Sequence, residues 1–254
     1  MRILLTNDDG VHARGMGVLE RIARQISDDV TIVAPMEEQS GKSRSLTITQ
    51  PVRLRHLGEK RYAVTGTPTD AVMMALAHVM KDAKPDLILS GVNRGANIGE
   101  DVSYSGTVAA AMEGALAGIR SIALSQRETK RGSGDQVSFD TAEAWGVQVL
   151  KPLLDAPLAP RSLININFPP VAPETVKGVK VVSQGLRDYG GLNLIQGLDP
   201  RGYEYFWYGL GRVASTPTAD TDLEAIEQGY VTVTPLHLDL THRASLDMLT
   251  EIYR

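Results

Sequence analysis

The sequence contains no cysteine among its 254 residues. This absence excludes a disulfide framework, a zinc site with thiolate ligands, an iron–sulfur cluster and a cysteine nucleophile. It also fits a reducing compartment. The apolar and charged fractions, 43% and 22%, are those of a globular protein, so a disordered or fibrous chain is excluded as well.

Long apolar runs and an excess of basic charge are missing too. The longest apolar stretch, 71–80, is interrupted by His78 and is far shorter than the ~20 residues of a membrane-spanning helix. The N-terminus places Asp8 and Asp9 where a signal peptide would continue its apolar run. The net charge of −4 disfavours general nucleic-acid binding. We therefore expect a cytoplasmic protein that requires neither a nucleic acid nor a membrane.

Several common catalytic signatures are absent. The sequence has no G-x-G-x-x-G in its glycine-rich loop, no P-loop and no G-x-S-x-G nucleophile elbow. Its histidines show no H-x-x-x-H spacing. His78 lies in an apolar helical segment and is interpreted as a core residue, whereas His12 follows Asp9 closely enough to lie near a site.

Short apolar runs alternate with helical patterns over residues 1–170. Residues 2–6 and 30–34 are typical of buried strands, and 15–29 between them has the apolar spacing of an amphipathic helix. Such a strand–helix–strand unit predicts parallel pairing. Further helices are predicted at 68–80, 107–117 and 139–154, and further strands at 46–57, 61–64, 86–90, 121–125 and 163–167. We expect an α/β fold with an open, mostly parallel sheet, and we assign residues 1–170 to a catalytic domain.

The pattern changes after residue 170, where prolines interrupt the chain and glycine and aromatic residues become frequent. We predict that 171–254 is a smaller, β-rich extension that ends in a helix at 244–253. Residues 203–208 read YEYFWY. This run fits either burial in the core or a contact between subunits, and the sequence leaves both open. We predict the contact, in a homodimer or homotetramer.

Asp8 and Asp9 are the strongest candidates for chemistry. They follow the first predicted strand, and ligands of open α/β sheets bind at the carboxyl ends of strands. Two adjacent carboxylates repel each other unless a cation or a proton intervenes, and a divalent metal with oxygen ligands would relieve that repulsion. The simpler explanation is an Asn-Asp-Asp-Gly turn that leads into the next helix.

Two more polar loops follow strands and converge on the same edge. Ser40 and Asn93 offer oxygen donors suited to a magnesium-like ion. Lys42, Arg44 and Arg94 are candidate substrate contacts through phosphate.

A third motif, Ser105-Gly106-Thr107, opens a helix after a glycine-rich loop that carries Asn97. The free N–H groups of a helix N-terminus bind anions. We predict that these residues hold a phosphate and that a bulkier residue at 106 would leave metal binding intact. An ordinary helix cap is the alternative.

These segments resemble the SurE survival-protein nucleotidases. The resemblance rests on stretches from nearly the whole chain: ILLTNDDG, VAPMEEQSGKSRSLT, VTGTPTDAV, LILSGVNRGANIGEDVSYSGTVAAAMEGALAGIRSIALS and IEQGYVTVTPL. It implies a Rossmann-like N-terminal domain, a C-terminal part that mediates oligomerisation, a cytoplasmic location and a metal-dependent phosphatase acting on nucleoside monophosphates.

The resemblance also implies four metal ligands, which correspond to Asp8, Asp9, Ser40 and Asn93. One Mg²⁺ or Mn²⁺ per subunit would polarise the phosphoryl group, and a water would attack in line. Asp8 or Asp9 would accept the proton of that water. A phosphoaspartate on Asp8 is the mechanistic alternative, although Gly10 interrupts the usual Asp-x-Asp pattern. A non-catalytic nucleotide or metal sensor and a metal-dependent nucleotide-sugar transferase are the alternative functions.

Overall fold

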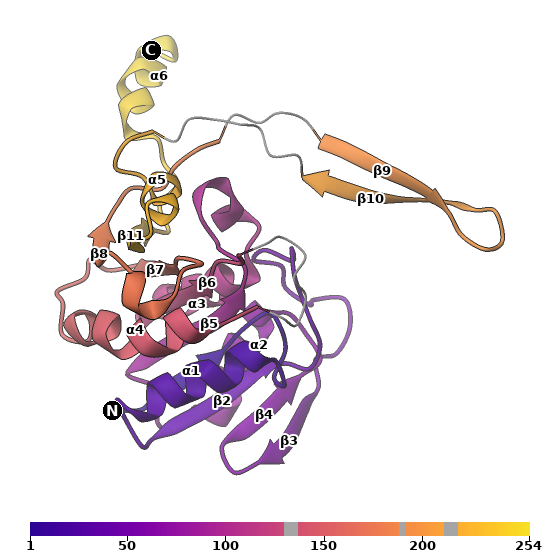
Figure 1. Ribbon diagram of the computed structural model, residues 1–254, viewed down its shortest axis with the longest axis vertical. Helices are drawn as coiled ribbons and strands as arrows, with labels where there is room; N and C mark the ends of the chain where they lie inside the picture. Colours follow the sequence, from indigo (N-terminus) through magenta and orange to yellow (C-terminus); the bar gives the residue numbers. More distant parts are fainter. Residues whose placement is uncertain (130–136, 188–191, 211–217) are drawn as a thin grey trace.

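The computed structural model describes residues 1–129, 137–187, 192–210 and 218–254. Its centre is a nine-stranded sheet in the order β3-β4-β2-β1-β5-β6-β7-β11-β8. The run from β4 to β7 is parallel throughout, while β3 pairs antiparallel with β4 and β11 antiparallel with β7. The predicted mostly parallel α/β fold is confirmed (Figure 1).

The strands of the sheet are buried on both faces at its centre. β1 is buried along its whole length, as expected of a parallel strand covered by helices on both sides. The strand bounds are β1 Ile3–Thr6, β2 Val30–Pro35, β3 Leu54–Gly58, β4 Arg61–Val64, β5 Leu87–Arg94, β6 Arg120–Gln126, β7 Ser162–Phe168, β8 Val179–Val181 and β11 Val231–His237.

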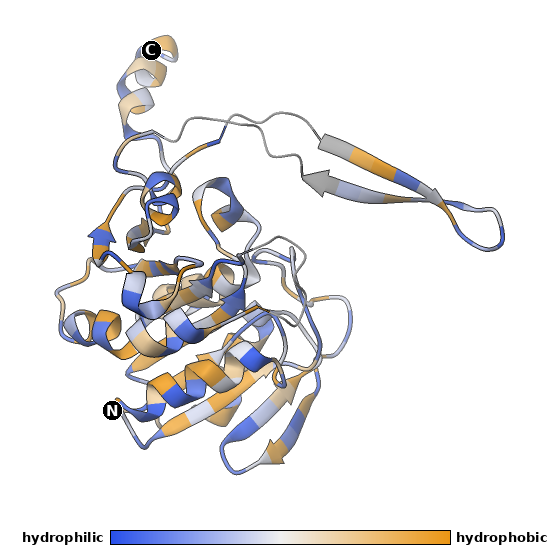
Figure 2. Cartoon of the chain, in the orientation of Figure 1, coloured by the Kyte–Doolittle hydropathy of each residue, from blue (hydrophilic) through white to orange (hydrophobic). Residues whose placement is uncertain are grey.

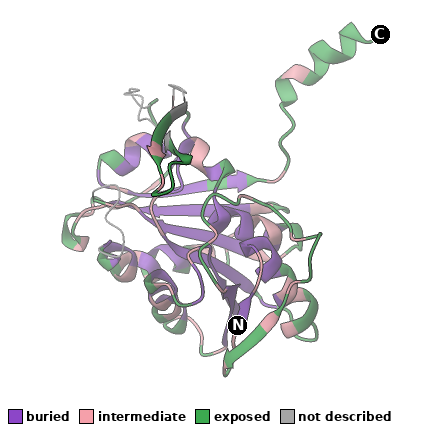
Figure 3. Ribbon diagram, turned by 90° about the vertical axis from the view of Figure 1, so that its right-hand side faces the viewer, coloured by how far each residue is buried: buried purple, intermediate pink, exposed green. Residues whose placement is uncertain are grey.

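Helices form a layer on each face of the sheet (Figures 1 and 3). α1 (Arg14–Arg24) and α4 (Asp140–Leu150) pack together over the larger core. α2 (Pro68–Met74) and α3 (Gly106–Leu116) pack together on the opposite face. Because α3 is rich in alanine and glycine, its backbone lies close to the sheet and brings its N-terminus to the carboxyl end of β1.

Three predicted elements differ from those observed. Strand β3 covers only the end of the predicted 46–57, because Thr47 donates its N–H and its hydroxyl to the Asp70 carboxylate instead of to a strand. The predicted helix 68–80 changes to a π-helix over Ala75–Val79. Strand β5 continues to Arg94, so Asn93 lies on a strand rather than in the long loop predicted from residue 91.

The segment after residue 170 contributes to two structures. Strands β8 and β11 belong to the main sheet, whereas β9 (Leu192–Leu198) and β10 (Glu204–Leu210) form a separate antiparallel pair. This β9–β10 arm extends away from the body, as does α6 (Leu246–Ile252) at the C-terminus (Figure 1). The domain boundary at residue 170 stays a prediction.

The aromatic run on the arm is exposed in the single chain. Phe206 is 52% exposed and Trp207 is 67% exposed, and the neighbouring β9 carries exposed leucine and isoleucine (Figure 2). Burial in the core, one of the two explanations that the sequence left open, is therefore wrong. An arm that projects from the body has no core to enter.

A buried carboxylate joins two loops of the body. Asp222, the first residue of α5 (Asp222–Glu227), is fully buried and accepts hydrogen bonds from the N–H groups of Gly99 and Gly185 at 2.9 and 2.8 Å. Arg187 adds ion pairs to Glu100 and Asp101.

Within the described ranges, no helix is long and apolar enough to cross a membrane.

Candidate metal and phosphate site

The candidate site lies where the strand order changes direction. From β1 the chain moves to β2 on one side, and it later returns to β5 on the other side of β1. Ligands of open α/β sheets bind at such a switch point, beyond the carboxyl ends of the strands. Asp8 and Asp9 follow β1 here, and Asn93 and Arg94 end β5.

Asp8 is the inner carboxylate. It is 4% exposed and accepts a short hydrogen bond from the Thr107 hydroxyl of α3. Burial raises the pKa of Asp8 above its ordinary value, despite the opposing effect of the Thr107 bond. Gly106 lies directly against it: a Cβ atom at position 106 would be 2.7 Å from the Asp8 Cβ and 2.9 Å from its Oδ2.

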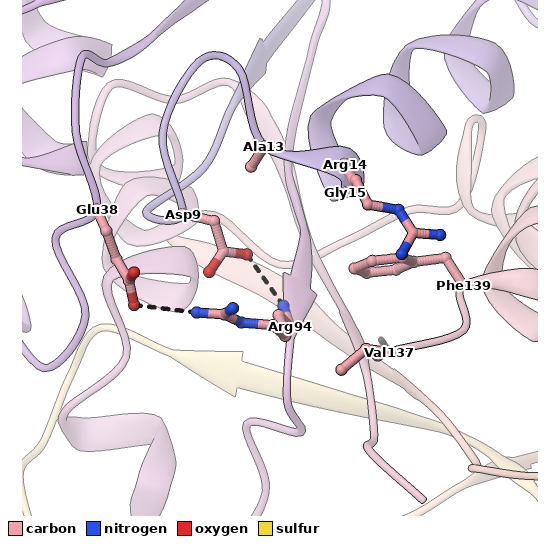
Figure 4. Close-up of a pocket in the computed structure, with 8 residues that line it drawn as sticks. All are labelled: Asp9, Ala13, Arg14, Gly15, Glu38, Arg94, Val137 and Phe139. Atoms are coloured by element: carbon pink, nitrogen blue, oxygen red, sulfur yellow. Dashed lines mark hydrogen bonds and ion pairs between the residues drawn. The ribbon is translucent and has the colours of Figure 1, made fainter. Parts of the chain in front are cut away.

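Asp9 is the outer carboxylate and borders an open pocket. Its Oδ2 accepts a hydrogen bond from the backbone N–H of Arg94 at 3.0 Å (Figure 4). Burial, together with the repulsion from Asp8, raises the pKa of Asp9 to about 7. Both carboxylates are thus held where their negative charge is poorly compensated, which is the setting that a divalent cation stabilises.

The chain neighbours of the other two predicted ligands, Ser40 and Asn93, are hydrogen-bonded to this pair. The N–H of Gln39 donates to the Asp8 carbonyl at 2.7 Å, which holds the Ser40 loop beside β1. The Asn93 side chain donates its NH₂ to the Gly95 carbonyl at 2.8 Å, so its amide oxygen is the atom suited to a cation. Within the described part of the chain, no three His, Cys, Asp or Glu side chains form a metal-binding group. The predicted ligand set has only two such side chains, the carboxylates of Asp8 and Asp9, and is completed by a hydroxyl and an amide.

Glu38 also borders the site, and sequence reasoning missed it. Its Oε1 accepts hydrogen bonds from the Ser40 hydroxyl at 2.9 Å and from the Arg94 guanidinium at 3.3 Å (Figure 4). Its charge contributes to the raised pKa of both Asp8 and Asp9. The available signal was its position two residues before Ser40, in a loop already expected at this edge of the sheet.

The three predicted basic contacts lie in different surroundings. Arg94 lines the pocket beside Asp9. Arg44 forms an ion pair with Glu113 on α3 at 3.1 Å. Lys42 is exposed on the loop. Of the three, Arg94 is the one that the structure brings to the carboxylates.

The predicted phosphate contacts have protein partners. The Ser105 hydroxyl caps α3 by accepting the Val108 N–H at 3.0 Å, and Thr107 donates to Asp8. The Asn97 side chain donates to the Ser125 hydroxyl at 2.8 Å. The hydroxyls therefore build the site, while the first backbone N–H groups of α3 remain the anion-binding element of the motif.

The two histidines singled out in the sequence are both exposed. His12 lies on the surface after Asp9, and His78 lies on the surface of the π-helical turn. The prediction that His78 belongs to the core is wrong, because the widened turn leaves its side chain on the solvent side. Neither residue is among those that line the pocket at Asp9.

Buried polar atoms lie beneath the carboxylates. Thr6, at the end of β1, and Ser90, within β5, are register partners. Their hydroxyls and the Asn7 side-chain oxygen are buried and have no hydrogen-bond partner within the described chain. Oxygen atoms left without donors favour a cation or ordered water nearby, which agrees with the chemistry of the carboxylate pair above them.

Comparisons with known proteins identify the family to which the chain belongs. The sequence model of the family described as survival protein SurE matches residues 3–191. This chain belongs to the SurE family. It is 68% identical over 254 residues, the full length of both chains, to the 5'-nucleotidase SurE of Rhizorhabdus wittichii. It is 57% identical over 251 residues, 99% of each chain, to that of Erythrobacter litoralis.

A solved structure extends the similarity to three dimensions. The SurE protein from Aquifex aeolicus superposes on this SurE chain with a TM-score of 0.84 and 36% identity, over 100% of both chains. The similarity therefore includes the segment after residue 191, which the family model does not match.

The buried pair predicts an unusual pH dependence of stability. The folded protein retains the Asp9 proton up to about pH 7, whereas the unfolded chain loses it near the ordinary value of 3.8. Stability without metal should therefore fall as the pH rises from about 5 to about 7.5, because the folded state binds more protons over that range. Asp70, Glu100 and Glu143 have lowered pKa values, so they are deprotonated below this pH range and do not contribute to the fall.

Thermal unfolding in EDTA, followed across this pH range, measures the fall. Excess Mn²⁺ should remove it by binding the deprotonated pair, and so should the double substitution Asp8→Asn/Asp9→Asn. A metal-free protein whose melting temperature is flat from pH 5 to pH 7.5 would contradict the raised pKa values.

The contact at Gly106 corrects the expectation that a bulkier residue there would leave metal binding intact. The new side chain would displace the Asp8 carboxylate. We expect Gly106→Ala to weaken Mn²⁺ binding by about tenfold or more, since loss of a group that positions a ligand costs about 10–100-fold. Calorimetric titration of Mn²⁺ tests this. Gly58→Ala, where a Cβ meets nothing within 4 Å, is the matched control and should bind as the parent protein does.

Proposed function

We propose that this SurE chain is a divalent-metal-dependent phosphatase that releases phosphate from nucleoside monophosphates, with 5'-nucleotides as its main substrates and 3'-nucleotides as further ones. The nucleotidase part rests on relatives of up to 68% identity that bear that name over the full length. The metal-dependent part rests on the site itself.

The observation that carries the proposal is the Asp8–Asp9 pair against the N-terminus of α3. Two buried carboxylates with raised pKa values meet a helix end across the Gly106 contact. A carboxylate pair attracts a cation, and a helix N-terminus attracts an anion. A phosphate ester next to a metal ion satisfies both at once.

Asp8, Asp9, Ser40 and Asn93 would hold one Mg²⁺ or Mn²⁺, since all four offer the oxygen donors that these ions prefer. When bound, the ion supplies a positive charge that polarises the phosphoryl group and neutralises developing negative charge. Thr107 fixes the orientation of Asp8 by its hydrogen bond, and the Arg94 N–H fixes that of Asp9.

The backbone N–H of Gly106 would bind a phosphate oxygen beside the Asp8 carboxylate, while Thr107 holds that carboxylate by its hydrogen bonds. Asn97 supports this end of the site: its carbonyl accepts hydrogen bonds from the side chains of Asn165 and Asn167 at 2.7 and 3.2 Å. The Ser105 cap keeps the first turn of α3 formed. Arg94 reaches the same edge and adds a positive charge near the substrate.

Proton transfer falls to Asp9 in this proposal. Asp9 borders the pocket, whereas Asp8 is buried behind it. A water that enters the pocket therefore meets the Asp9 carboxylate first. This geometry favours attack by water, with Asp9 as the proton acceptor, over a phosphoaspartate on the buried Asp8.

Asp9→Asn should lower kcat/KM for AMP by about a hundredfold or more, the usual range for loss of an acid–base group, and Asp8→Asn should lower it strongly because it removes a carboxylate ligand of the proposed metal ion. Phosphate release from AMP with Mn²⁺ is the measurement, and exhaustive EDTA treatment should abolish it. Asp82→Asn, an exposed carboxylate in a turn, is the matched control. Full activity in either site variant would contradict the assignment.

The same assay separates the enzyme from a nucleotide or metal sensor. A sensor would bind AMP and Mn²⁺ in calorimetry without releasing phosphate. An enzyme releases phosphate with turnover, and a panel of 5'- and 3'-nucleotides then ranks its substrates.

We also propose that the protein is a homodimer or homotetramer assembled through the β9–β10 arm. The aromatic side chains of the arm are exposed in one chain, and exposed apolar surface of this kind marks an interface. Antiparallel pairs of two strands are marginal in water by themselves, so the arm gains stability from a partner surface.

Light scattering at micromolar concentration should therefore give a dimer or tetramer mass. The double substitution Phe206→Glu/Trp207→Glu should shift the mass toward the monomer, because it introduces charge into the interface. Met73→Glu on α2, which replaces a side chain of similar exposure (44%), should leave the mass unchanged. A monomer mass for the parent protein would refute the arm as an interface.

A further inference from the structure

A pocket extends from Asp9 toward the first turn of α1 (Figure 4). Its near end carries polar groups: Asp9, Glu38 and Arg94. Its far end is formed by Val137 and Phe139, together with Arg14. One end of the pocket is thus the proposed metal site. The other end is a largely apolar wall with one arginine, and the release of phosphate does not require such a wall.

The far wall is rigid. Val137 and Phe139 are 4% and 6% exposed and belong to the main core. At Gly15 a Cβ atom would be 1.9 Å from the Val92 carbonyl oxygen, so the first turn of α1 lies directly on β5. A preformed wall of this kind suits a ligand, because little conformational freedom is lost on binding.

The chemistry of the wall suits a flat aromatic ligand. Arg14 and Phe139 both line this end of the pocket, and Figure 4 shows the Arg14 guanidinium and the Phe139 ring on the same wall, so that a planar cation and an aromatic ring are both available there. Arginine and aromatic side chains are the groups on which nucleobases stack in proteins. Neither residue belongs to the metal ligands or phosphate contacts proposed above.

The size of the pocket agrees with one such ring. Its volume is about 140 Å³, and a cavity of about 150 Å³ admits a benzene molecule. Asp9 and Arg94 face the cavity at the other end of the pocket (Figure 4). A phosphate ester at the carboxylates therefore has room to direct its organic part along the pocket.

We infer that the pocket between Asp9 and the Arg14–Phe139 wall is the subsite for the nucleobase, and that Arg14 and Phe139 determine the preference for nucleotides over other phosphate esters. This inference rests on the proposed nucleotidase function and names the residues that would give it specificity. Asp9 and Arg94 lie at the phosphate end, and Arg14 and Phe139 contact the base.

The test compares two esters that share the same sugar and phosphate. AMP carries a base, and ribose 5-phosphate does not. With Mn²⁺ present, we expect the ratio of kcat/KM for AMP to that for ribose 5-phosphate to fall by about tenfold in Arg14→Ala, mainly through the KM for AMP. Phe139→Leu, which keeps the site apolar, should lower the same ratio. Arg24→Ala, an exposed arginine at the other end of α1, is the matched control and should retain the parent ratio.

A second measurement needs neither metal nor catalysis. Adenosine, which has no phosphate, is titrated calorimetrically into the protein in EDTA. We expect its affinity to fall about tenfold in Arg14→Ala and to be unchanged in Arg24→Ala. Thermal unfolding of each variant verifies that it is folded. Because Arg14 is exposed, its substitution does not disturb the core, whereas a change at the buried Phe139 alters packing as well.

The outcomes separate this inference from the proposed function. If the parent protein hydrolyses neither ester, the nucleotidase function itself fails. If it hydrolyses AMP but the AMP to ribose 5-phosphate ratio and the adenosine affinity are the same in Arg14→Ala and the parent, the base binds elsewhere and this inference is overturned. A lowered ratio with parental hydrolysis of ribose 5-phosphate supports it.

Discussion

The burial of two adjacent carboxylates at the end of β1 is the constraint on which the site depends. Asp8 and Asp9 repel each other and have lost most of their hydration. The Thr107 hydroxyl and the Arg94 N–H each favour the charged form, yet the pKa values stay raised, so the protein alone does not compensate the pair. The divalent cation proposed for this site would complete the charge balance. Burying the two carboxylates costs free energy. The central strands tolerate that cost because they are buried on both faces and packed between two layers of helices.

Much of the fold could be predicted because each element carries its own local signal. The buried strand at 2–6 and the amphipathic helix after it were both visible as short-range patterns. At the start of α2, Thr67 and Asp70 form a capping box from residues only three positions apart. Strand order has no such signal. That β5 returns to pair with β1, opposite β2, is decided by long-range packing. The sequence therefore predicted that loops meet at one edge, but not that Asp9 and Arg94 would be joined by a hydrogen bond.

The residues that sequence reasoning placed imperfectly depend on contacts between distant segments. Gly106 was interpreted as space for phosphate, whereas its neighbour is the Asp8 side chain, 98 positions earlier in the sequence. Glu38 has no motif of its own and gains its role from Ser40 and Arg94. The YEYFWY run illustrates a different limit. Its aromatic composition predicts that these side chains are buried against another surface. The structure shows that the arm extends away from the body, so the body of the same chain does not cover them (Figures 1 and 2).

The segment that leads from β5 into α3 is held by side chains that come much later in the sequence. Asp222 accepts hydrogen bonds from the N–H groups of Gly99 and Gly185, and Arg187 pairs with Glu100 and Asp101. The buried carboxylate of Asp222 is the stronger tie, because removing it would leave two N–H groups without an acceptor, at a cost of about 1–3 kcal/mol each. Arg187 is partly exposed, so its ion pairs contribute less. The residues that precede Ser105 and Gly106 are thus positioned by contacts with a distant part of the chain as well as by β5 and α3.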